Sequence, residues 1–328
     1  MNMNQAASTD PTPNPSDPRA LGPYSRVIVD EALRRGIQVE LLDKEAGFIA
    51  LSHNGHRVVC RESLSELTSA IAMSRCDDKG LTCRLLAKAG LRVPAQQPAA
   101  DAQRNREFLQ RHAHIVVKPL RGEQGAGVSV DISVEQDMSD AIEAARRVDD
   151  RVLLEEYIRG EDLRVVVIDD EVVAAAVRRP PQVTGNGQDS IEQLIQAQSQ
   201  RREQATGGES HIPMDAETRR CVSEAGYALD DILPENETLV VHRSDNLHTG
   251  ATIHDVTEHV HPAIRQAAVA AARAIDIPVV GIDFLIPATH SDDYVIIEAN
   301  ERPGLANHEP QPTAQRYIDL LFPDTAER

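Results

Sequence analysis

Residues 279–310 read VVGIDFLIPATHSDDYVIIEANERPGLANHEP, and this stretch holds two strongly apolar runs that carry carboxylates. Asp283 interrupts the first run, and Glu298 and Asn300 close the second. Because side chains alternate along a strand, Glu298 and Asn300 leave the same face, and Asp283 can meet them if the runs pair as a hairpin. Carboxylate and amide oxygens suit Mg²⁺, which shares its shell with phosphates and water. The stretch therefore indicates a magnesium site, although either acid alone is more typical of an ordinary half-exposed hairpin.

The composition limits the classes of function. A chain of 328 residues can bury a sizeable core in two or three lobes. Its formal net charge of −18 disfavours a nucleic-acid backbone as a partner. No apolar run approaches the roughly 20 residues of a membrane span, and the four cysteines form no CxxC pair. We therefore expect a cytoplasmic protein that binds neither nucleic acid nor a membrane.

Four segments are expected along the chain. Residues 1–20 are rich in Pro, Asn, Ser and Asp, which is typical of a disordered tail. Residues 21–75 predict a small N-terminal α/β lobe, in which Asn54-Gly55 is a strong hairpin signal. Residues 76–154 and 155–328 predict two larger subdomains that contain both helices and strands, and these carry the candidate chemistry.

Two helix starts are predicted from capping residues. Ser63 begins the pattern of a capping box, which predicts a helix over residues 63–74. Asp77 is the expected N-cap of the next helix, so Lys79 lies in its first turn, where the helix dipole disfavours a cation. A lysine in this place can reach an anion held at the helix start, although a solvated lysine is the more common case.

A lysine and a glycine-rich loop follow. Residues 115–117 predict an apolar strand that delivers Lys118 at its end. The loop comprises residues 121–127 and contains Arg121, Gly122, Gly125 and Gly127. Glycines let a backbone approach a phosphate closely, and the two cationic side chains supply countercharge. The loop is not a Walker A loop, because no GK[ST] follows, and taken alone it is often merely a turn.

The sequence VLLEEYIRGEDLR, residues 152–164, predicts a strand that leaves its sheet at a hinge. Backbone N–H and C=O groups exposed at such a hinge can read an adenine edge. Asp162, just past the Gly160 turn, can accept hydrogen bonds from ribose hydroxyls, and Arg164 can pair with a phosphate or with a local acid. An exposed acidic hairpin is the alternative interpretation.

A second arginine is expected at a strand end. LVVHRSDNLHTG, residues 239–250, predicts a strand that ends in Arg243 and leads into a polar turn rich in donors. An arginine that faces the acidic cluster from a strand end can neutralise a transferring phosphoryl group.

In this order the features resemble the ATP-grasp fold: two lysines, a glycine-rich loop, an EExxxGxDxR hinge, a strand-end arginine and then D…ExN. The resemblance spans roughly residues 77–323. The segments VTGNGQDSIEQLI, HRSDNLHTG and VGIDFLI…IIEAN resemble the ligase domains of cyanophycin synthetase and bifunctional glutathione synthetase. Residues 298–323 resemble the C-terminal part of N-acetylglutaminylglutamine synthetase.

The resemblance implies an α+β ATP-grasp fold with a small N-terminal lobe, a central subdomain with a lid loop and a C-terminal subdomain with the magnesium and acceptor sites. It implies ATP binding by Lys79, Lys118, Arg121, Gly122, Gly125, Gly127, Glu155, Glu156, Tyr157, Ile158, Asp162 and Arg164. It implies two Mg²⁺ ions, for which Mn²⁺ can substitute, on Asp283, Glu298 and Asn300. Stabilisation of the transition state falls to Arg243 and the Gly304 amide, and orientation of the acceptor amino acid to Asn307 and His308.

The function implied by the resemblance is that of an ATP-dependent carboxylate–amine ligase. A carboxylate is a poor electrophile, so the γ-phosphoryl group first moves onto it, and an amine then attacks the acyl phosphate. The expected substrates are N-acetylglutamine and glutamine, and the expected product is the osmoprotectant dipeptide N-acetylglutaminylglutamine. The alternatives are a glutathione-like or cyanophycin-like ligase and, in another class, a nucleotide-binding regulator without catalysis.

One departure from the resemblance bears on partners. An acetyltransferase-like region usually precedes the ligase part in the N-acetylglutaminylglutamine synthetases, and the lobe at residues 21–75 is too short to hold one. The resemblance therefore carries over the ligation step and leaves open a separate acetyltransferase in the same pathway, as well as a homodimer. We expect alanine in place of Asp283 or Glu298 to abolish activity with little loss of fold, since both are predicted ligands and not core residues.

Overall fold

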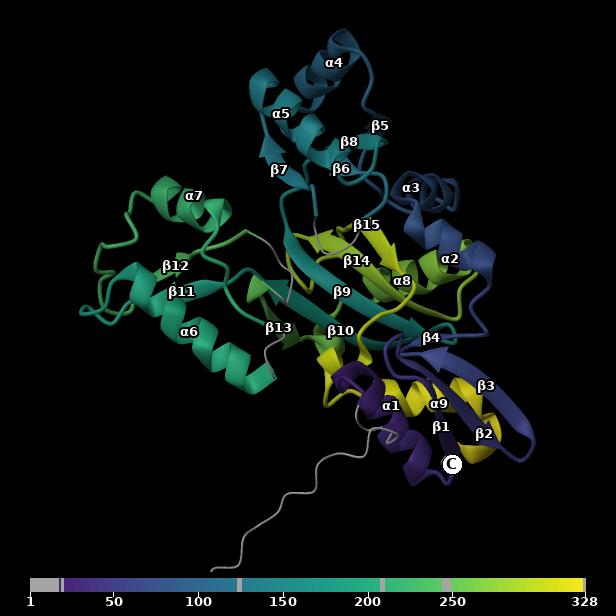
Figure 1. The fold of residues 1–328 in the computed structure, drawn as a ribbon. Coiled ribbons are helices and arrows are strands. Elements are labelled where there is room, and N and C mark those ends of the chain that lie inside the picture. Colours follow the sequence, from purple (N-terminus) through teal and green to yellow (C-terminus); the bar gives the residue numbers. More distant parts are fainter. Residues whose placement is uncertain (1–17, 19–20, 123–125, 207–209, 244–248, 327–328) are drawn as a thin grey trace, which may run out of the picture. The chain divides into compact units, whose positions relative to one another are not determined.

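The backbone forms two compact units in the computed structural model (Figure 1). The described residues are 18, 21–122, 126–206, 210–243 and 249–326. One unit contains the chain up to Thr68 together with Arg302–Arg328, and the other contains Ser69–Glu301. The tail expected at residues 1–20 lies outside the described residues apart from Pro18.

The first unit is a four-stranded antiparallel sheet in the order β1-β2-β3-β4, accompanied by helices from both ends of the chain. Its elements are α1 (Pro23–Arg34), β1 (Gln38–Asp43), β2 (Phe48–His53), β3 (His56–Arg61), β4 (Leu64–Ser65), η4 (Leu305–His308), α9 (Thr313–Leu321) and η5 (Pro323–Thr325). The hairpin predicted at Asn54-Gly55 is confirmed, because both residues have the positive φ that a two-residue turn between twisted strands requires.

The helix predicted over residues 63–74 is wrong in its first half. Residues 64–65 form β4 and pair with β3, and the Ser63 hydroxyl donates to the carbonyl of Pro303 at 2.7 Å. The helix α2 (Ala70–Asp77) begins later, where the Ser69 hydroxyl caps its first turn. Strand pairing uses the backbone groups that a helix would need, so the tertiary context outweighs the local capping pattern.

The second unit contains a five-stranded antiparallel sheet in the order β13-β10-β9-β14-β15, here called the central sheet. Its strands are β9 (Glu161–Ile168), β10 (Glu171–Arg179), β13 (Thr252–Asp255), β14 (Val279–Ile286) and β15 (Val295–Asn300). The helix α8 (Pro262–Ile275) packs on one face of this sheet (Figure 1). Alanines at helical spacing on α8, among them Ala268 and Ala271, are fully buried, which lets the helix approach the sheet closely.

Two smaller sheets belong to the same unit. The first has the order β5-β8-β6-β7, with strands β5 (Gln96–Pro98), β6 (Ile115–Pro119), β7 (Ser129–Ile132) and β8 (Val152–Glu156) and helices α4 (Ala102–His112) and α5 (Glu135–Arg146). The second pairs β11 (Gln182–Thr184) with β12 (Thr238–Val240) and carries α6 (Ile191–Thr206) and α7 (Ala216–Glu224). The remaining elements are α3 (Lys79–Lys88) and η3 (Thr257–His259). The domain boundary expected near residue 154 stays a prediction.

Two register shifts decide which side chains face each other in the central sheet. The β9–β10 hairpin starts from the Asp169-Asp170 turn, and one extra residue in β10 then brings Arg178 opposite Asp162. One extra residue in β15 similarly brings Glu298 opposite Asp283. Because side chains alternate with a period of two, each shift by one residue exchanges the face that every later side chain occupies.

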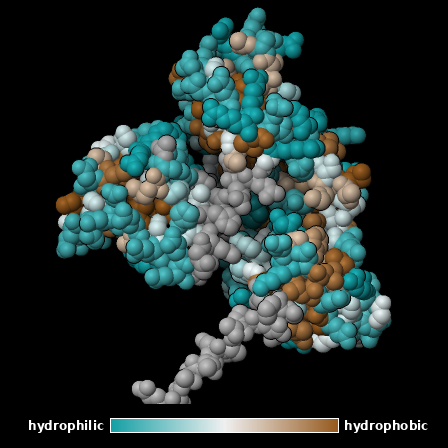
Figure 2. Space-filling model, in the orientation of Figure 1, coloured by the Kyte–Doolittle hydropathy of each residue, from teal (hydrophilic) through white to brown (hydrophobic). Residues whose placement is uncertain are grey.

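Hydrophilic residues cover most of the face that Figure 2 shows, and hydrophobic residues gather in patches between them. Among the residues that the structure describes, no helix combines the length and the apolar character that a bilayer crossing needs.

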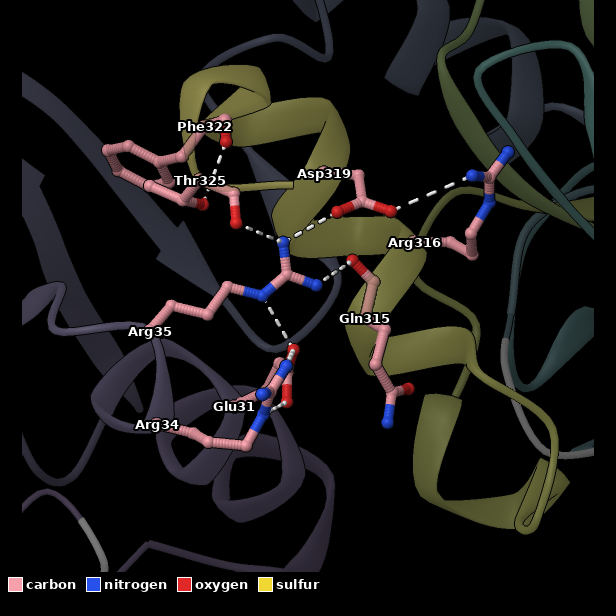
Figure 3. A network of polar contacts seen from close by, with 8 residues as sticks. All are labelled: Glu31, Arg34, Arg35, Gln315, Arg316, Asp319, Phe322 and Thr325. Atoms are coloured by element: carbon pink, nitrogen blue, oxygen red, sulfur yellow. Dashed lines mark hydrogen bonds and ion pairs between the residues drawn. The ribbon is translucent and has the colours of Figure 1, made fainter. Parts of the chain in front are cut away.

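The buried guanidinium of Arg35 joins the first and last helices of the first unit (Figure 3). It forms ion pairs with Glu31 at 2.6 Å and with Asp319 at 2.5 Å, and it donates to the carbonyl of Gln315 at 3.0 Å. Burial opposes the charge of Arg35, but its bonds to the two carboxylates outweigh burial and raise its pKa. The network therefore fastens α9 to α1, although their positions in the sequence lie far apart.

We expect Arg35→Ala to lower the free energy of unfolding by about 3 kcal/mol or more, because it leaves buried acceptors without their cation. Arg34→Ala is the matched control, since Arg34 also pairs with Glu31 but its side chain is 47% exposed, against 4% for Arg35. The control should cost less than about 1 kcal/mol. Thermal and urea unfolding measure both variants, and equal costs would contradict the assigned role of Arg35.

Candidate active site

The acidic pair and the asparagine meet on one face of the central sheet. Asp283 on β14 stands opposite Glu298 on β15, and Asn300 follows two residues later on the same face. The Asn300 amide nitrogen donates to Asp283 Oδ2 at 3.2 Å. The antiparallel pairing predicted from the two apolar runs is therefore confirmed, and the role of the three residues as ligands stays a prediction.

Two arginines from neighbouring strands hold the Asp283 carboxylate, which is only 1% exposed. Arg164 on β9 is bidentate: its Nε contacts Oδ1, and its Nη2 lies 2.9 Å from Oδ2. Arg178 on β10 places its Nη2 3.1 Å from the same Oδ2. Burial alone would raise the pKa of Asp283, but the two guanidiniums outweigh it and hold the pKa below its usual value. Asp283 is therefore a fixed, charged carboxylate inside the sheet.

Asp162 lies on the same face and shares one of these arginines. Both of its carboxylate oxygens accept from Arg178, each at 2.8 Å. Burial raises the pKa of Asp162, and Arg178 opposes that rise only in part. Asp162 and Arg164 were predicted to contact a nucleotide, and the structure shows that both also form ion pairs within the protein.

Lys79 lies at the start of α3, as predicted, although the N-cap is Asp78 and not Asp77. Its ammonium group lies 3.0 Å from Glu298 Oε1 and donates to the carbonyl of Gly122 at 2.9 Å. Lys79 thus links the acidic pair to the first glycine of the predicted lid loop. A carboxylate partner offsets the unfavourable position of a cation at a helix N-terminus.

Lys118 is buried at the end of β6 and forms an ion pair with Glu155 on β8 at 2.6 Å. Gln96 on β5 stands directly opposite Glu155 and donates to the same carboxylate. The structure therefore brings together two residues predicted to bind ATP, Lys118 and Glu155, and Gln96 holds the Glu155 carboxylate from the neighbouring strand.

The predicted hinge is present but partly bonded within the protein. Strand β8 ends at Glu156, whose carboxylate accepts from the Ala95 N–H at 3.2 Å. The Tyr157 N–H donates to the carbonyl of His114 at 3.2 Å, so it is engaged and not exposed as expected. Ile158 follows and is half-buried. An adenine edge would have to be read by other backbone groups of this hinge.

The glycine-rich loop is described at its two ends. Arg121 pairs with Asp77 at 2.9 Å, and Gly125 lies outside the described residues. Gly122 and Gly127 both have positive φ. A Cβ at Gly127 would lie 2.9 Å from the Val148 side chain, so any side chain there would be strained and crowded.

Arg243 lies beyond the end of its strand and not at it, and its role in stabilising the transition state stays a prediction. Strand β12 ends at Val240, and the exposed Arg243 pairs with Glu224 on α7 at 2.5 Å. The polar turn predicted after it includes residues 244–248, which lie outside the described residues. Among the described residues, the arginines that contact Asp283 are Arg164 and Arg178.

Gly304, Asn307 and His308 belong to the first unit, so their catalytic and acceptor roles stay predictions. Gly304 immediately precedes η4. A Cβ on it would lie 2.7 Å from Asn307 Nδ2 and 2.8 Å from the ring of Tyr24, so packing requires glycine there. His308 is buried, and Asn307 is half-buried.

Sequence reasoning missed two residues of this site, Arg178 and Gln96. Arg178 ends the apolar run of β10, and a simple hairpin through Asp169-Asp170 would have placed it opposite Glu161. Only the extra residue in β10 brings it to Asp162. Gln96 follows Pro94 in a stretch without a strand pattern, so no local signal indicated its strand neighbour.

The donor set fits a magnesium ion in chemistry and placement. Glu298 is 33% exposed, and Asn300 donates to Asp283 through its nitrogen, so its amide oxygen points away from that carboxylate. Hard oxygens from one or two carboxylates beside phosphates are what Mg²⁺ usually takes. Asp283 can ligate the ion only through an oxygen that also accepts a hydrogen bond from an arginine. Glu298 and Asn300 are therefore the more accessible ligands.

The fold and the residues of its central face define an ATP-grasp protein of the α+β class. Residues 76–188 match the RimK-like ATP-grasp domain. The cyanophycin synthetase of Geminocystis herdmanii is 31% identical over 93% of this chain and 37% of that protein. The glutathione biosynthesis bifunctional protein of Enterococcus faecalis is 26% identical over 92% of this chain and 43% of that protein.

A solved structure shows the same fold. The bifunctional glutathione synthetase of Pasteurella multocida aligns with a TM-score of 0.68 and 23% identity, over 93% of this chain and 44% of that one. The chain thus spans less than half of the length of these relatives. The predicted ATP-grasp fold is confirmed.

The buried contacts of Asp283 change the expected effect of replacing it. Asp283→Asn should lower the free energy of unfolding by about 3 kcal/mol or more, since it leaves buried arginines without their carboxylate. Glu298→Gln should cost less than about 1 kcal/mol, because Glu298 is partly exposed. Unfolding curves of both variants test this ranking, and an Asp283→Asn protein as stable as the wild type would contradict the buried network.

Proposed function

We propose that this chain is an ATP-dependent carboxylate–amine ligase that forms ADP and works through an acyl phosphate. One observation carries the proposal: Asp283, Glu298 and Asn300 share a face of the central sheet, and Lys79 reaches Glu298 at 3.0 Å. Oxygen ligands beside a cation suit a triphosphate and its metal. The similarity to cyanophycin synthetase and to bifunctional glutathione synthetase supports the same class of reaction.

The proposed roles follow from charge and placement. Lys79 and Lys118 hold phosphates, and the loop at residues 121–127 excludes water, because an acyl phosphate hydrolyses readily. Glu298 and Asn300 bind Mg²⁺, and the buried Asp283 lies opposite Glu298 on the adjacent strand. When bound, Mg²⁺ neutralises phosphate charge and orients the transferring group.

Arg243 keeps the role that the sequence predicts for it, the stabilisation of negative charge on the transferring phosphoryl group. In the structure its guanidinium pairs with Glu224 at an exposed position. Arg164 and Arg178 instead hold the buried carboxylate of Asp283 in place.

The finer proposal is that the substrates are N-acetylglutamine and glutamine and that the product is N-acetylglutaminylglutamine. It rests on the resemblance of residues 298–323 to the synthetases of that dipeptide. The free thiols of the four cysteines support a reducing, cytoplasmic location. A homodimer and a separate acetyltransferase in the same pathway belong to this finer proposal.

Phosphate release from ATP tests the reaction class. With Mg²⁺, N-acetylglutamine and glutamine present, we expect release that falls to background when either amino acid is omitted, because the amine resolves the acyl phosphate. Mass spectrometry should detect the dipeptide at the same time. Release as fast without the amine would contradict ligation, and ADP binding without turnover for any acid and amine would identify a regulator instead. Product formation only with another acid and amine would overturn the assignment of N-acetylglutamine and glutamine as substrates and leave the reaction class intact.

Glu298→Gln tests the predicted ligand without disturbing the buried network. We expect its rate to fall by about a hundredfold or more, since a preorganised charge at the reacting group is lost. Asp292→Asn is the control, because Asp292 is exposed in the loop before β15 and undergoes the same change in charge. Steady-state rates at saturating Mg²⁺ decide, with melting curves to confirm that both variants fold. A Glu298→Gln enzyme as active as the control would contradict the ligand role.

A further inference from the structure

One guanidinium, that of Arg178, joins two carboxylates of the central sheet. Its Nε and Nη2 bind the two oxygens of Asp162 at 2.8 Å each, and its Nη2 also lies 3.1 Å from Asp283 Oδ2. The two carboxylates come from β9 and β14, which are adjacent, and Arg178 comes from β10 on the far side of β9. The side chain is 17% exposed, so protein surrounds it on most sides.

The shape of the arginine side chain makes this link rigid. A planar guanidinium holds a carboxylate through two parallel bonds, which fixes both its distance and its orientation. A lysine ammonium supplies the same charge from a single point and cannot reproduce that fork. A carboxylate has about four lone-pair sites, so Asp162 keeps acceptor capacity for hydroxyl groups while Arg178 holds it.

The two carboxylates have different predicted partners. The hinge sequence assigns Asp162 to the ribose hydroxyls, and Asp283 lies behind Glu298 and Asn300 at the metal end of the site. We propose that Arg178 is a positioning residue that fixes these two carboxylates relative to each other and so couples ribose recognition to metal binding. The inference rests on the proposed function, since it requires a nucleotide and Mg²⁺ on this face.

Binding calorimetry on the full chain tests the coupling without relying on turnover. The probes are ADP and 2′,3′-dideoxy-ADP, each titrated with and without Mg²⁺. The variant is Arg178→Lys, which keeps the charge and loses the fork. Arg179→Lys is the matched control, because Arg179 is the next residue on β10 and its half-exposed side chain lies 3.9 Å from Glu161.

We expect the wild type and Arg179→Lys to bind ADP at least about tenfold more tightly than the dideoxy analogue. Hydrogen bonds from the ribose hydroxyls to a charged carboxylate account for a difference of this size. In Arg178→Lys that ratio should fall below about threefold, and the gain in ADP affinity on adding Mg²⁺ should shrink as well. A lysine variant that keeps both effects would overturn the proposal. An Arg178→Lys protein that no longer distinguishes ADP from the dideoxy analogue but still gains the full ADP affinity with Mg²⁺ would also overturn it. Ribose recognition and metal binding would then be independent of each other.

A second variant covers the case in which Arg178→Lys does not fold. Asp162→Asn keeps an acceptor oxygen for ribose and removes the charged anchor of Arg178. Although Asp162 is not a predicted metal ligand, the Mg²⁺ effect on ADP affinity should still shrink in this variant, and an unchanged effect would overturn the coupling. A wild-type chain that binds neither nucleotide would contradict the proposed function itself, an outcome distinct from both of these.

Discussion

The buried carboxylate of Asp283 is the constraint on which the central face depends. A charge inside a protein costs several kcal/mol unless donors surround it, and removal of one partner leaves the other uncompensated. Asp283 Oδ2 lies within 3.2 Å of nitrogens from Arg164, Arg178 and Asn300, which come from three different strands. The register of β9, β10, β14 and β15 is therefore tied to the electrostatics of one side chain. The same arrangement leaves Glu298 as the more accessible carboxylate of the cluster, with its side chain 33% exposed.

Elements whose sequence signals lie within a few residues of one another were predicted from the sequence. The apolar runs of β14 and β15, the Asn54-Gly55 turn and the lysine at the start of α3 all follow from apolar patterning, turn chemistry or helix spacing. The shared face of Glu298 and Asn300 followed from the alternation of side chains along a strand, whereas Asp283 joins them because of the extra residue in β15. These predictions succeed because each depends on neighbours within a few residues.

The predictions that failed depend on contacts between distant residues. Without the extra residue in β10, Arg178 would face Glu161 and the link to Asp162 would not exist, and an apolar sequence does not show where such a residue is accommodated. Ser63 had the pattern of a helix cap, but the backbone groups that follow it pair with β3 as strand β4. The strand predicted to end in Arg243 stops at Val240, where its pairing with β11 ends.

We infer that the face formed by Asp283, Glu298 and Asn300 binds the metal of a metal–nucleotide complex. Anomalous diffraction from crystals grown with ADP and Mn²⁺ tests this most directly, because manganese can be located independently of any assumed coordination. We expect a manganese peak in coordination contact with oxygens of Glu298 and Asn300 and with the phosphates, with Lys79 beside them. A nucleotide whose manganese lies away from these side chains would contradict it.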